Sequence, residues 1–141
     1  MRYLLDTNVL SEVVKKKPSR VVIDWLGRQQ ETSLYLSVIT FGELQKGINK
    51  LAQSHRRKKL QDWVDQNLAE RFAGRTFDVD IRVAVRWGEI SGTAEKVGKK
   101  VPVLDGLLAA TALEFGLTVV TGNVEHFEVT GVPWLDPWRS G

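Results

Sequence analysis

Short apolar runs alternate with longer helical segments along this chain, and this alternation constrains the fold more than any other feature of the sequence. Strands are expected at residues 2–5, 34–36, 76–77, 117–121 and 132–135. Helices, with apolar residues three and four positions apart, are expected at residues 9–14, 38–51, 54–72, 80–97 and 105–115, and after Ser19 as far as Leu26. Strands that alternate with helices predict a short central parallel sheet flanked by helices on both faces, a three-layer α/β/α sandwich.

The composition fits one globular domain, which we expect to span residues 1–141. Hydrophobic residues make up 43% of the chain, enough for a single core. The absence of cysteine excludes a disulfide framework and a thiolate metal site, and it is compatible with a reducing cytoplasm. Asp6 interrupts the first apolar run, and no later run reaches the ~18 residues of a membrane span. We therefore expect a cytoplasmic protein without membrane association. Its net charge of +3 is compatible with a polyanionic partner but does not identify one.

Polar residues follow two of the expected strands at the point where each strand ends. Asp6 comes directly after the first strand, and Asn123 follows the strand that ends at Thr121. The carboxyl ends of parallel strands meet at one edge of a sheet, where binding sites gather. Carboxylates brought together there would repel one another, and a cation that prefers oxygen ligands, such as Mg²⁺ or Mn²⁺, would relieve that repulsion. With two histidines and no cysteine, a zinc site is not expected.

Three acids are candidates for such a site, Asp6, Glu43 and Asp105, and each also has a purely structural explanation. Aspartate is a favoured helix N-cap, so Asp6 and Asp105 could each cap the helix that follows. Thr40 and Glu43 fit the S/T-x-x-E pattern of a capping box. None of these acids, taken alone, distinguishes a functional site from helix capping.

Four segments of the chain carry these residues in a fixed order. They are LLDTNVLSE at residues 4–12, SVITFGEL at 37–44 with Gly47 behind it, LDGLLAATA at 104–112 and TVVTGNVEHF at 118–127. Together they resemble the successive motifs of PIN domains, and more closely those of VapC-like toxins, the FitB-like branch included. The resemblance covers nearly the whole chain, and it implies a PIN-like fold and a single PIN domain over residues 1–141.

The resemblance implies a Mg²⁺-dependent endoribonuclease, with Mn²⁺ able to replace Mg²⁺, that hydrolyses RNA phosphodiesters with a metal-activated water. The first three acids of the family correspond to Asp6, Glu43 and Asp105, which would be catalytic residues and would hold the metal. The small hydroxyl or amide that commonly assists the first acid corresponds to Thr7 or Asn8.

The fourth catalytic position of the family, often aspartate, corresponds to Asn123, whose amide oxygen could still bind the metal or one of its waters. Glu125 is the alternative, although it is more easily explained as a first-turn acid stabilised at a helix N-terminus. We favour Asn123. Gly122 stands where many relatives have Arg or Lys, so one candidate phosphate contact is missing.

The resemblance also implies three partners: a cognate antitoxin in a type II toxin–antitoxin hetero-oligomer, an RNA substrate, and a second copy in a homodimer. We expect the second copy to pack on spare apolar surface of the helices between Ser19 and Leu51. The alternative function is a non-catalytic PIN-like module that binds RNA or protein, but such modules typically lose one of the three acids, and all three are present. A phosphatase of the haloacid-dehalogenase type would need aspartate at position 8, where this chain has Asn8.

Overall fold

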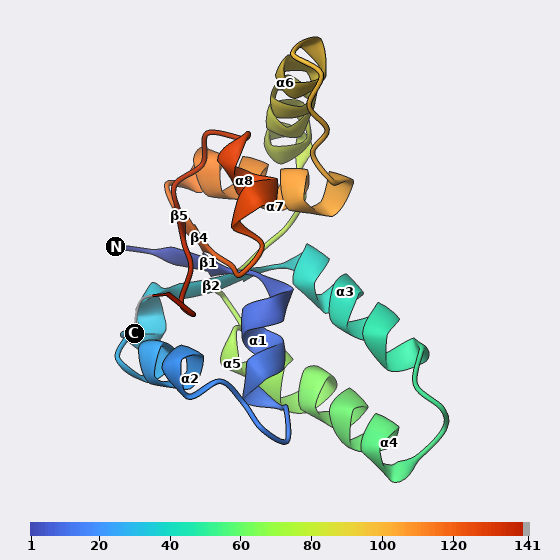
Figure 1. The fold of residues 1–141 in the computed structure, drawn as a ribbon. Coiled ribbons are helices and arrows are strands. Elements are labelled where there is room, and N and C mark those ends of the chain that lie inside the picture. Colours follow the sequence, from blue (N-terminus) through green and yellow to red (C-terminus); the bar gives the residue numbers. More distant parts are fainter. Residues whose placement is uncertain (140–141) are drawn as a thin grey trace.

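The central layer of the fold is a five-stranded sheet in the order β3-β2-β1-β4-β5, seen in a computed structural model that describes residues 1–139 (Figure 1). The strands are β1 (Tyr3–Leu5), β2 (Leu34–Ser37), β3 (Thr76–Phe77), β4 (Thr118–Val120) and β5 (Trp134–Leu135). Every pairing is parallel, and β5 lies at an edge, where the preceding Pro133 is tolerated. The predicted parallel sheet is confirmed. The expected end of the domain at residue 141 lies outside the described residues.

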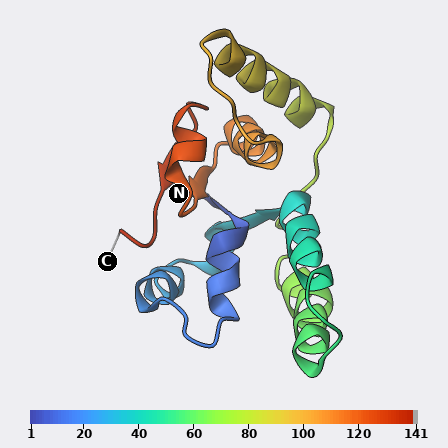
Figure 2. The ribbon, with the colours of Figure 1, turned by 45° about the vertical axis from the view of Figure 1, so that its right-hand side comes forward.

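Helices cover both faces of the sheet, so the predicted three-layer sandwich is also confirmed (Figures 1 and 2). One side carries α6 (Ile81–Lys96), α7 (Val103–Phe115) and α8 (Val124–Glu128). The other carries α1 (Thr7–Val13), α2 (Arg20–Gly27), α4 (His55–Asp62) and α5 (Ala69–Arg71). The remaining long helix, α3 (Val38–Asn49), leaves the carboxyl end of β2 and packs against α1, α4 and α7. A short 3-10 turn, Glu31–Ser33, precedes β2.

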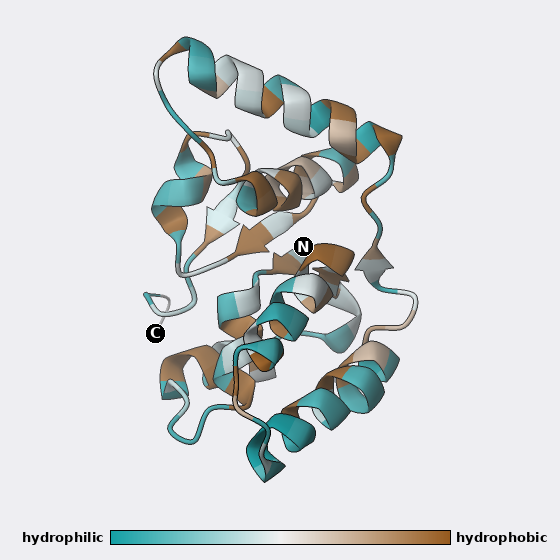
Figure 3. Cartoon of the chain, turned by 90° about the vertical axis from the view of Figure 1, so that its right-hand side faces the viewer, coloured by the Kyte–Doolittle hydropathy of each residue, from teal (hydrophilic) through white to brown (hydrophobic). Residues whose placement is uncertain are grey.

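Alternating side chains of the strands supply two separate cores, one on each face of the sheet. Leu4 and Val119 pack into the core under α6 and α7, whereas their neighbours Leu5 and Val120 pack into the core under α1 and α2. This follows from the pleat of a strand, which sends successive side chains to opposite faces. Figure 3 shows hydrophobic residues gathered in the strands and α7, and mostly hydrophilic residues along α4. The strands are therefore held from both sides, and the ends of β1 and β4 are fixed next to each other.

The helix predicted at residues 54–72 is continuous, but its middle turn is a π-helix, Trp63–Leu68, between α4 and α5. The apolar side chains along it recur every four residues, and in an α-helix of 3.6 residues per turn such positions drift by about 40° per step. The wider π-turn offsets this drift. As a result Leu68 and Phe72 are buried in the core on that face of the sheet, and Val64 is buried as well.

On the helices between Ser19 and Leu51, where we predict spare apolar surface, Val22, Trp25 and Ile48 are buried, whereas Val38 is 38% exposed. More of the exposed large apolar side chains lie between residues 79 and 104, at Val79, Ile81, Val85, Val97, Val103 and Leu104. The packing of a second copy on the helices between Ser19 and Leu51 stays a prediction. Along residues 1–139, none of the helices combines the length and the apolar character that crossing a membrane requires.

Candidate active site

Asp6 lies at the carboxyl edge of the sheet, where β1 passes into α1, and it is only 4% exposed. Its Oδ1 accepts a hydrogen bond from the backbone N–H of Thr7 at 2.8 Å. Its Oδ2 accepts one from the Thr121 hydroxyl at 2.8 Å and one from the Asn8 amide at 3.5 Å. The capping explanation is therefore correct in part, because Asp6 is the N-cap of α1, but the same carboxylate also bridges to the end of β4. Three donors hold Asp6 in one orientation.

Glu43 is joined to this position by Thr7, whose hydroxyl donates to Glu43 Oε1 at 2.6 Å. The predicted capping box of Thr40 and Glu43 is not formed. Instead α3 begins directly after β2, with Ser37 as its N-cap and the Ser37 hydroxyl accepting from the second N–H of the helix at 3.1 Å. The helix thus starts three residues too early for Thr40 to cap it, and Glu43 is left free to face the sheet edge.

Asp105 is the third residue of α7, which begins directly after Pro102. The explanation of Asp105 as a helix cap is therefore wrong, because the extended backbone of Pro102 already starts the helix. Asp105 is buried, and its Oδ2 lies 2.7 Å from Nδ1 of His126. Next to it, a Cβ at Gly106 would lie 2.9 Å from Cδ1 of Trp87, so glycine allows α6 to press against the first turn of α7.

The charges of the three acids act on one another. Burial, and to a smaller extent the charges of Asp105 and Glu43, raise the pKa of Asp6 from its ordinary value of 3.8 to about 6. The hydrogen bonds from Thr121 and Thr7 oppose this rise in pKa without cancelling it. The structure thus brings the three predicted acids together at the sheet edge, where their negative charges are close enough to repel.

Two side chains of the site, Thr121 and His126, are missed by reasoning from the sequence. Thr121 follows a β-branched run and is read as a strand residue; only the pairing of β4 with β1 brings its hydroxyl to Asp6. The sequence analysis uses the two histidines only to set aside a zinc site, and it gives His126 no role. The signal that could have identified it is its place in the first turn of a helix that begins at the same sheet edge.

Asn123 and Glu125, the two candidates for the fourth position, form no hydrogen bond with the three acids in the described part of the chain. The Asn123 side chain is exposed and hydrogen-bonds to none of residues 1–139, while its backbone N–H donates to the Thr121 hydroxyl at 2.9 Å. Glu125 is also exposed, and it lines a separate hollow of about 390 Å³ with Lys99, Lys100, Glu128 and Val129. The catalytic role of Asn123 therefore stays a prediction.

The ring of Trp138 covers Gly122, the position at which many relatives have Arg or Lys. A Cβ at Gly122 would lie 2.8 Å from Cζ3 of Trp138, so the ring occupies the space that a side chain would need. The Gly122 N–H donates to the Asn8 side-chain oxygen at 3.3 Å, which ties this loop to α1. Glycine at position 122 therefore has a packing reason in this chain.

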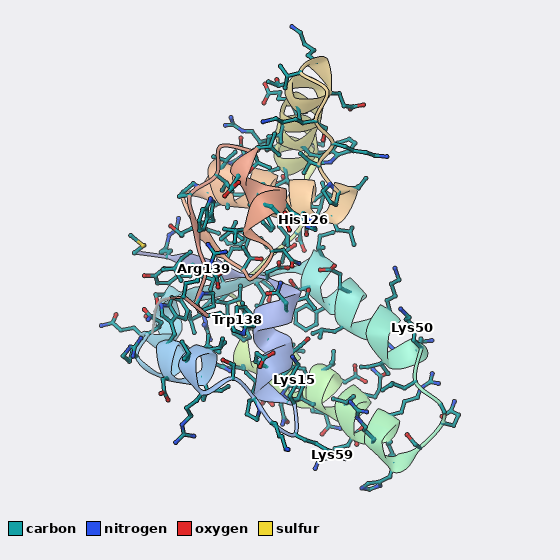
Figure 4. The ribbon with its side chains drawn as sticks, in the orientation of Figure 1. Lys15, Lys50, Lys59, His126, Trp138 and Arg139 are labelled. Carbon is teal, nitrogen blue, oxygen red and sulfur yellow. The ribbon has the colours of Figure 1, made fainter. Side chains whose placement is uncertain are left out.

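A groove leads away from the acids along α1, α3 and α4. Its first part, about 290 Å³, begins at Thr7 and Glu43 and has mostly apolar walls, Leu44 and Ile48 among them. A second hollow of about 540 Å³ adjoins it, and Trp63 lines both. Four basic residues also line these hollows: Lys15, Lys16, Arg56 and Lys59. Figure 4 shows Lys15 and Lys59 beside α1 and α4, with His126 across the sheet edge on α8.

The oxygen donors at the sheet edge fit a hydrated divalent cation. Within residues 1–139, no three or more His, Cys, Asp or Glu side chains are grouped tightly enough to hold a metal ion alone. Mg²⁺, however, keeps several waters and commonly binds protein through one or two carboxylates. Asp105 Oδ1 and Glu43 Oε2 accept no hydrogen bond from the described residues, so both remain available as ligands.

Known proteins resemble the chain along almost its entire length. Residues 3–132 match the PIN domain. The chain is 34% identical over 136 residues to "VapC ribonuclease Y4jK" of Sinorhizobium fredii, covering 96% of this chain and 97% of the relative. It is 36% identical over 136 residues to "Toxin FitB" of Neisseria gonorrhoeae, covering 96% and 98%. The crystal structure of FitAcB from Neisseria gonorrhoeae has a TM-score of 0.93 and 35% identity, covering 97% of this chain and 99% of that chain.

Proposed function

This chain belongs to the PIN-domain family, with VapC-like and FitB-like toxins among its relatives, and on that premise we propose that it is a Mg²⁺- or Mn²⁺-dependent endoribonuclease of the cytoplasm. The observation that carries the proposal is the meeting of Asp6, Glu43 and Asp105 at one edge of the sheet. These acids come from three separate elements, and burial of Asp6, with a smaller contribution from the charges of Asp105 and Glu43, raises the pKa of Asp6 to about 6. Carboxylates with a purely structural role would gain no stability from lying close to one another, whereas a cation-binding site requires their excess negative charge.

Each acid has a distinct part in the proposed reaction. A bound divalent cation would polarise a phosphoryl oxygen and lower the pKa of a water molecule that attacks the phosphorus. Asp105 and Glu43 supply the free oxygens, and the Thr7 hydroxyl fixes the orientation of Glu43. Asp6, which three hydrogen-bond donors hold in one orientation, would supply a fixed negative charge beside the cation. Asn123, exposed at the same edge, would contact the phosphate or a water through its amide.

Basic side chains along the groove would hold the RNA backbone on one side of the cleaved bond. Contacts of lysine and arginine with phosphates give affinity without reading sequence. Lys15, Lys16, Arg56 and Lys59 offer such contacts on the side of α1 and α4. The substrate is therefore proposed to be single-stranded RNA, whose flexible backbone can follow the groove.

The test of the enzyme proposal is cleavage of single-stranded RNA by purified protein, with Mn²⁺, with Mg²⁺ and with a chelator. We expect fragments that carry 5′-phosphate and 3′-hydroxyl ends, no cleavage in the chelator, and recovery when either metal is added back. The product ends distinguish this reaction from metal-independent ribonuclease contamination, which leaves cyclic or 3′-phosphate ends. RNA binding without cleavage in Mn²⁺ would reject the enzyme and support the non-catalytic alternative.

We also propose that an antitoxin binds in the groove at α1, α3 and α4 and thereby keeps the chain inactive. The apolar walls at Leu44 and Ile48 would bury an apolar segment, and the groove begins at Thr7 and Glu43. A partner lying in it can therefore place a cationic side chain beside the carboxylates. Such a charge-assisted contact is strong and would exclude a metal from the same oxygens.

Expression in bacteria tests this partner. The chain alone should arrest growth, and co-expression of its antitoxin should restore growth, because the antitoxin blocks RNA cleavage in the cell. Colony counts after induction measure both effects, and the Asp6→Asn variant, which keeps the groove, serves as the inactive control. Unimpaired growth with abundant, folded wild-type protein would contradict the toxin proposal.

A homodimer is proposed on a surface other than the one predicted from the sequence. Ile81 and Val85 on α6, and Val103 and Leu104 at the start of α7, are exposed apolar residues on two helices that pack together. Exposed apolar side chains on packed helices commonly mark an interface, because burying them removes them from water. A second copy covering α6 and α7 would leave the groove open for the antitoxin and for RNA.

A further inference from the structure

His126 reaches Asp105 from an element that is firmly anchored. It lies in α8, between Val124 and Phe127, which are both buried in the core, and the Thr130 hydroxyl donates to the carbonyl of Phe127 at 2.6 Å. The backbone under His126 is thus fixed on both sides. The imidazole is 41% exposed, whereas the Asp105 side chain that it contacts is 13% exposed. The contact therefore lies where the interior meets the open edge of the site.

The hydrogen bond engages one of the two oxygens of Asp105. A carboxylate can only accept hydrogen bonds, so the contact of 2.7 Å requires a proton on Nδ1 of His126, and Nδ1 is then unable to bind a metal. Among residues 1–139, His126 is the one side chain that hydrogen-bonds to Asp105. Asp6 differs, because three donors hold it. The orientation of Asp105 therefore depends on a single partner.

We propose that His126 is a positioning residue of the metal site, which holds Asp105 Oδ2 and so presents Oδ1 to the divalent cation. This inference rests on the proposed function, since it takes Asp105 to be a metal ligand. Among the described residues, the side chain that hydrogen-bonds to the third acid is His126, whereas neither Asn123 nor Glu125 forms a hydrogen bond with the acids. Partners that orient a metal-binding carboxylate typically contribute 10–100-fold to metal affinity.

Mn²⁺ titration calorimetry on the full chain tests the proposal with three variants. His126→Phe keeps the ring but removes the donor, and we expect it to weaken Mn²⁺ binding about 10–100-fold. His126→Asn places an amide N–H at the same number of bonds from Cβ as Nδ1, so it should keep most of the affinity. His126→Gln places its N–H one bond further away and should resemble the Phe variant. His55→Phe, an exposed histidine on α4, is the matched control and should bind as the wild type does.

The outcomes separate this inference from the function on which it rests. If the wild type binds Mn²⁺, Asp105→Asn does not, and His126→Phe binds as tightly as the wild type, then His126 has no positioning role and only this inference fails. A wild-type chain that binds no Mn²⁺ overturns both. Thermal unfolding without metal distinguishes a contact that merely joins α7 and α8, because losing such a contact would lower the melting temperature of the phenylalanine and glutamine variants and leave their Mn²⁺ affinity unchanged. If His126→Phe does not fold, the Mn²⁺ affinities of the asparagine and glutamine variants still test the proposal. Equal affinities in these two variants would reject a positioning role for His126.

Discussion

Replacing Asp6 by asparagine should lower the rate of RNA cleavage by about a thousand-fold while the protein stays folded. The substitution keeps the shape of the side chain and removes its negative charge from the centre of the acid group. A metal that stabilises the charge of the transition state supplies several kcal/mol, and each 1.36 kcal/mol corresponds to a factor of about ten in rate. The amide oxygen of the new side chain can still accept from the N–H of Thr7, so the start of α1 is preserved.

Single-turnover cleavage of a labelled RNA at saturating Mn²⁺ measures this effect, with circular dichroism to show that the fold is unchanged. Asp78→Asn is the matched control, because Asp78 is exposed and lies outside the acid group, and it should cleave at the wild-type rate. Asp105→Asn should behave like Asp6→Asn. Wild-type rates in Asp6→Asn would show that the sheet-edge acids are not the active site.

The position of Asp6 could be predicted from the sequence because it depends on few and local features. The short apolar run Tyr3–Leu5, followed by a helix, fixes the end of β1, and the carboxyl ends of parallel strands lie at one edge. The split of the core also follows from alternation alone, since Leu4 and Leu5 must face opposite sides of the sheet. These inferences need no knowledge of which distant segments meet.

The surroundings of the acids could not be predicted, because they depend on where helices begin and on contacts across the fold. Thr40 and Glu43 match a capping box, yet Ser37 takes the cap because the sheet carries β2 only as far as that residue. The hydroxyl of Thr121 meets Asp6 across 115 residues of sequence, and His126 meets Asp105 across 21. No local pattern encodes such pairs; they exist only once the strand order is known.

The free energy of unfolding of the metal-free protein should depend on pH in a way that Asp6 dominates. Its pKa is about 6 in the folded chain against an ordinary value of 3.8, so below pH 3.8 both folded and unfolded chains hold its proton. Between about pH 4 and 6 the folded chain keeps the proton that the unfolded chain releases, and stability therefore falls as pH rises. A rise of about two pKa units corresponds to about 3 kcal/mol lost above pH 6.

Urea unfolding in a chelator, at a series of pH values, measures this loss as the difference between the wild type and Asp6→Asn. Taking the difference removes the contribution of Glu31, whose pKa Arg71 and Arg75 hold at about 2 and which stabilises the fold at higher pH instead. Asp6→Asn should be the more stable protein above pH 6, and the two should converge toward pH 4. Mn²⁺ at 100 times its dissociation constant should return about 2.7 kcal/mol to the wild type, since it binds only the folded site. Curves that run parallel from pH 4 to 7 would mean that Asp6 is ionised at its ordinary pKa in the fold, and that neither its burial nor the neighbouring carboxylates disfavour its charge.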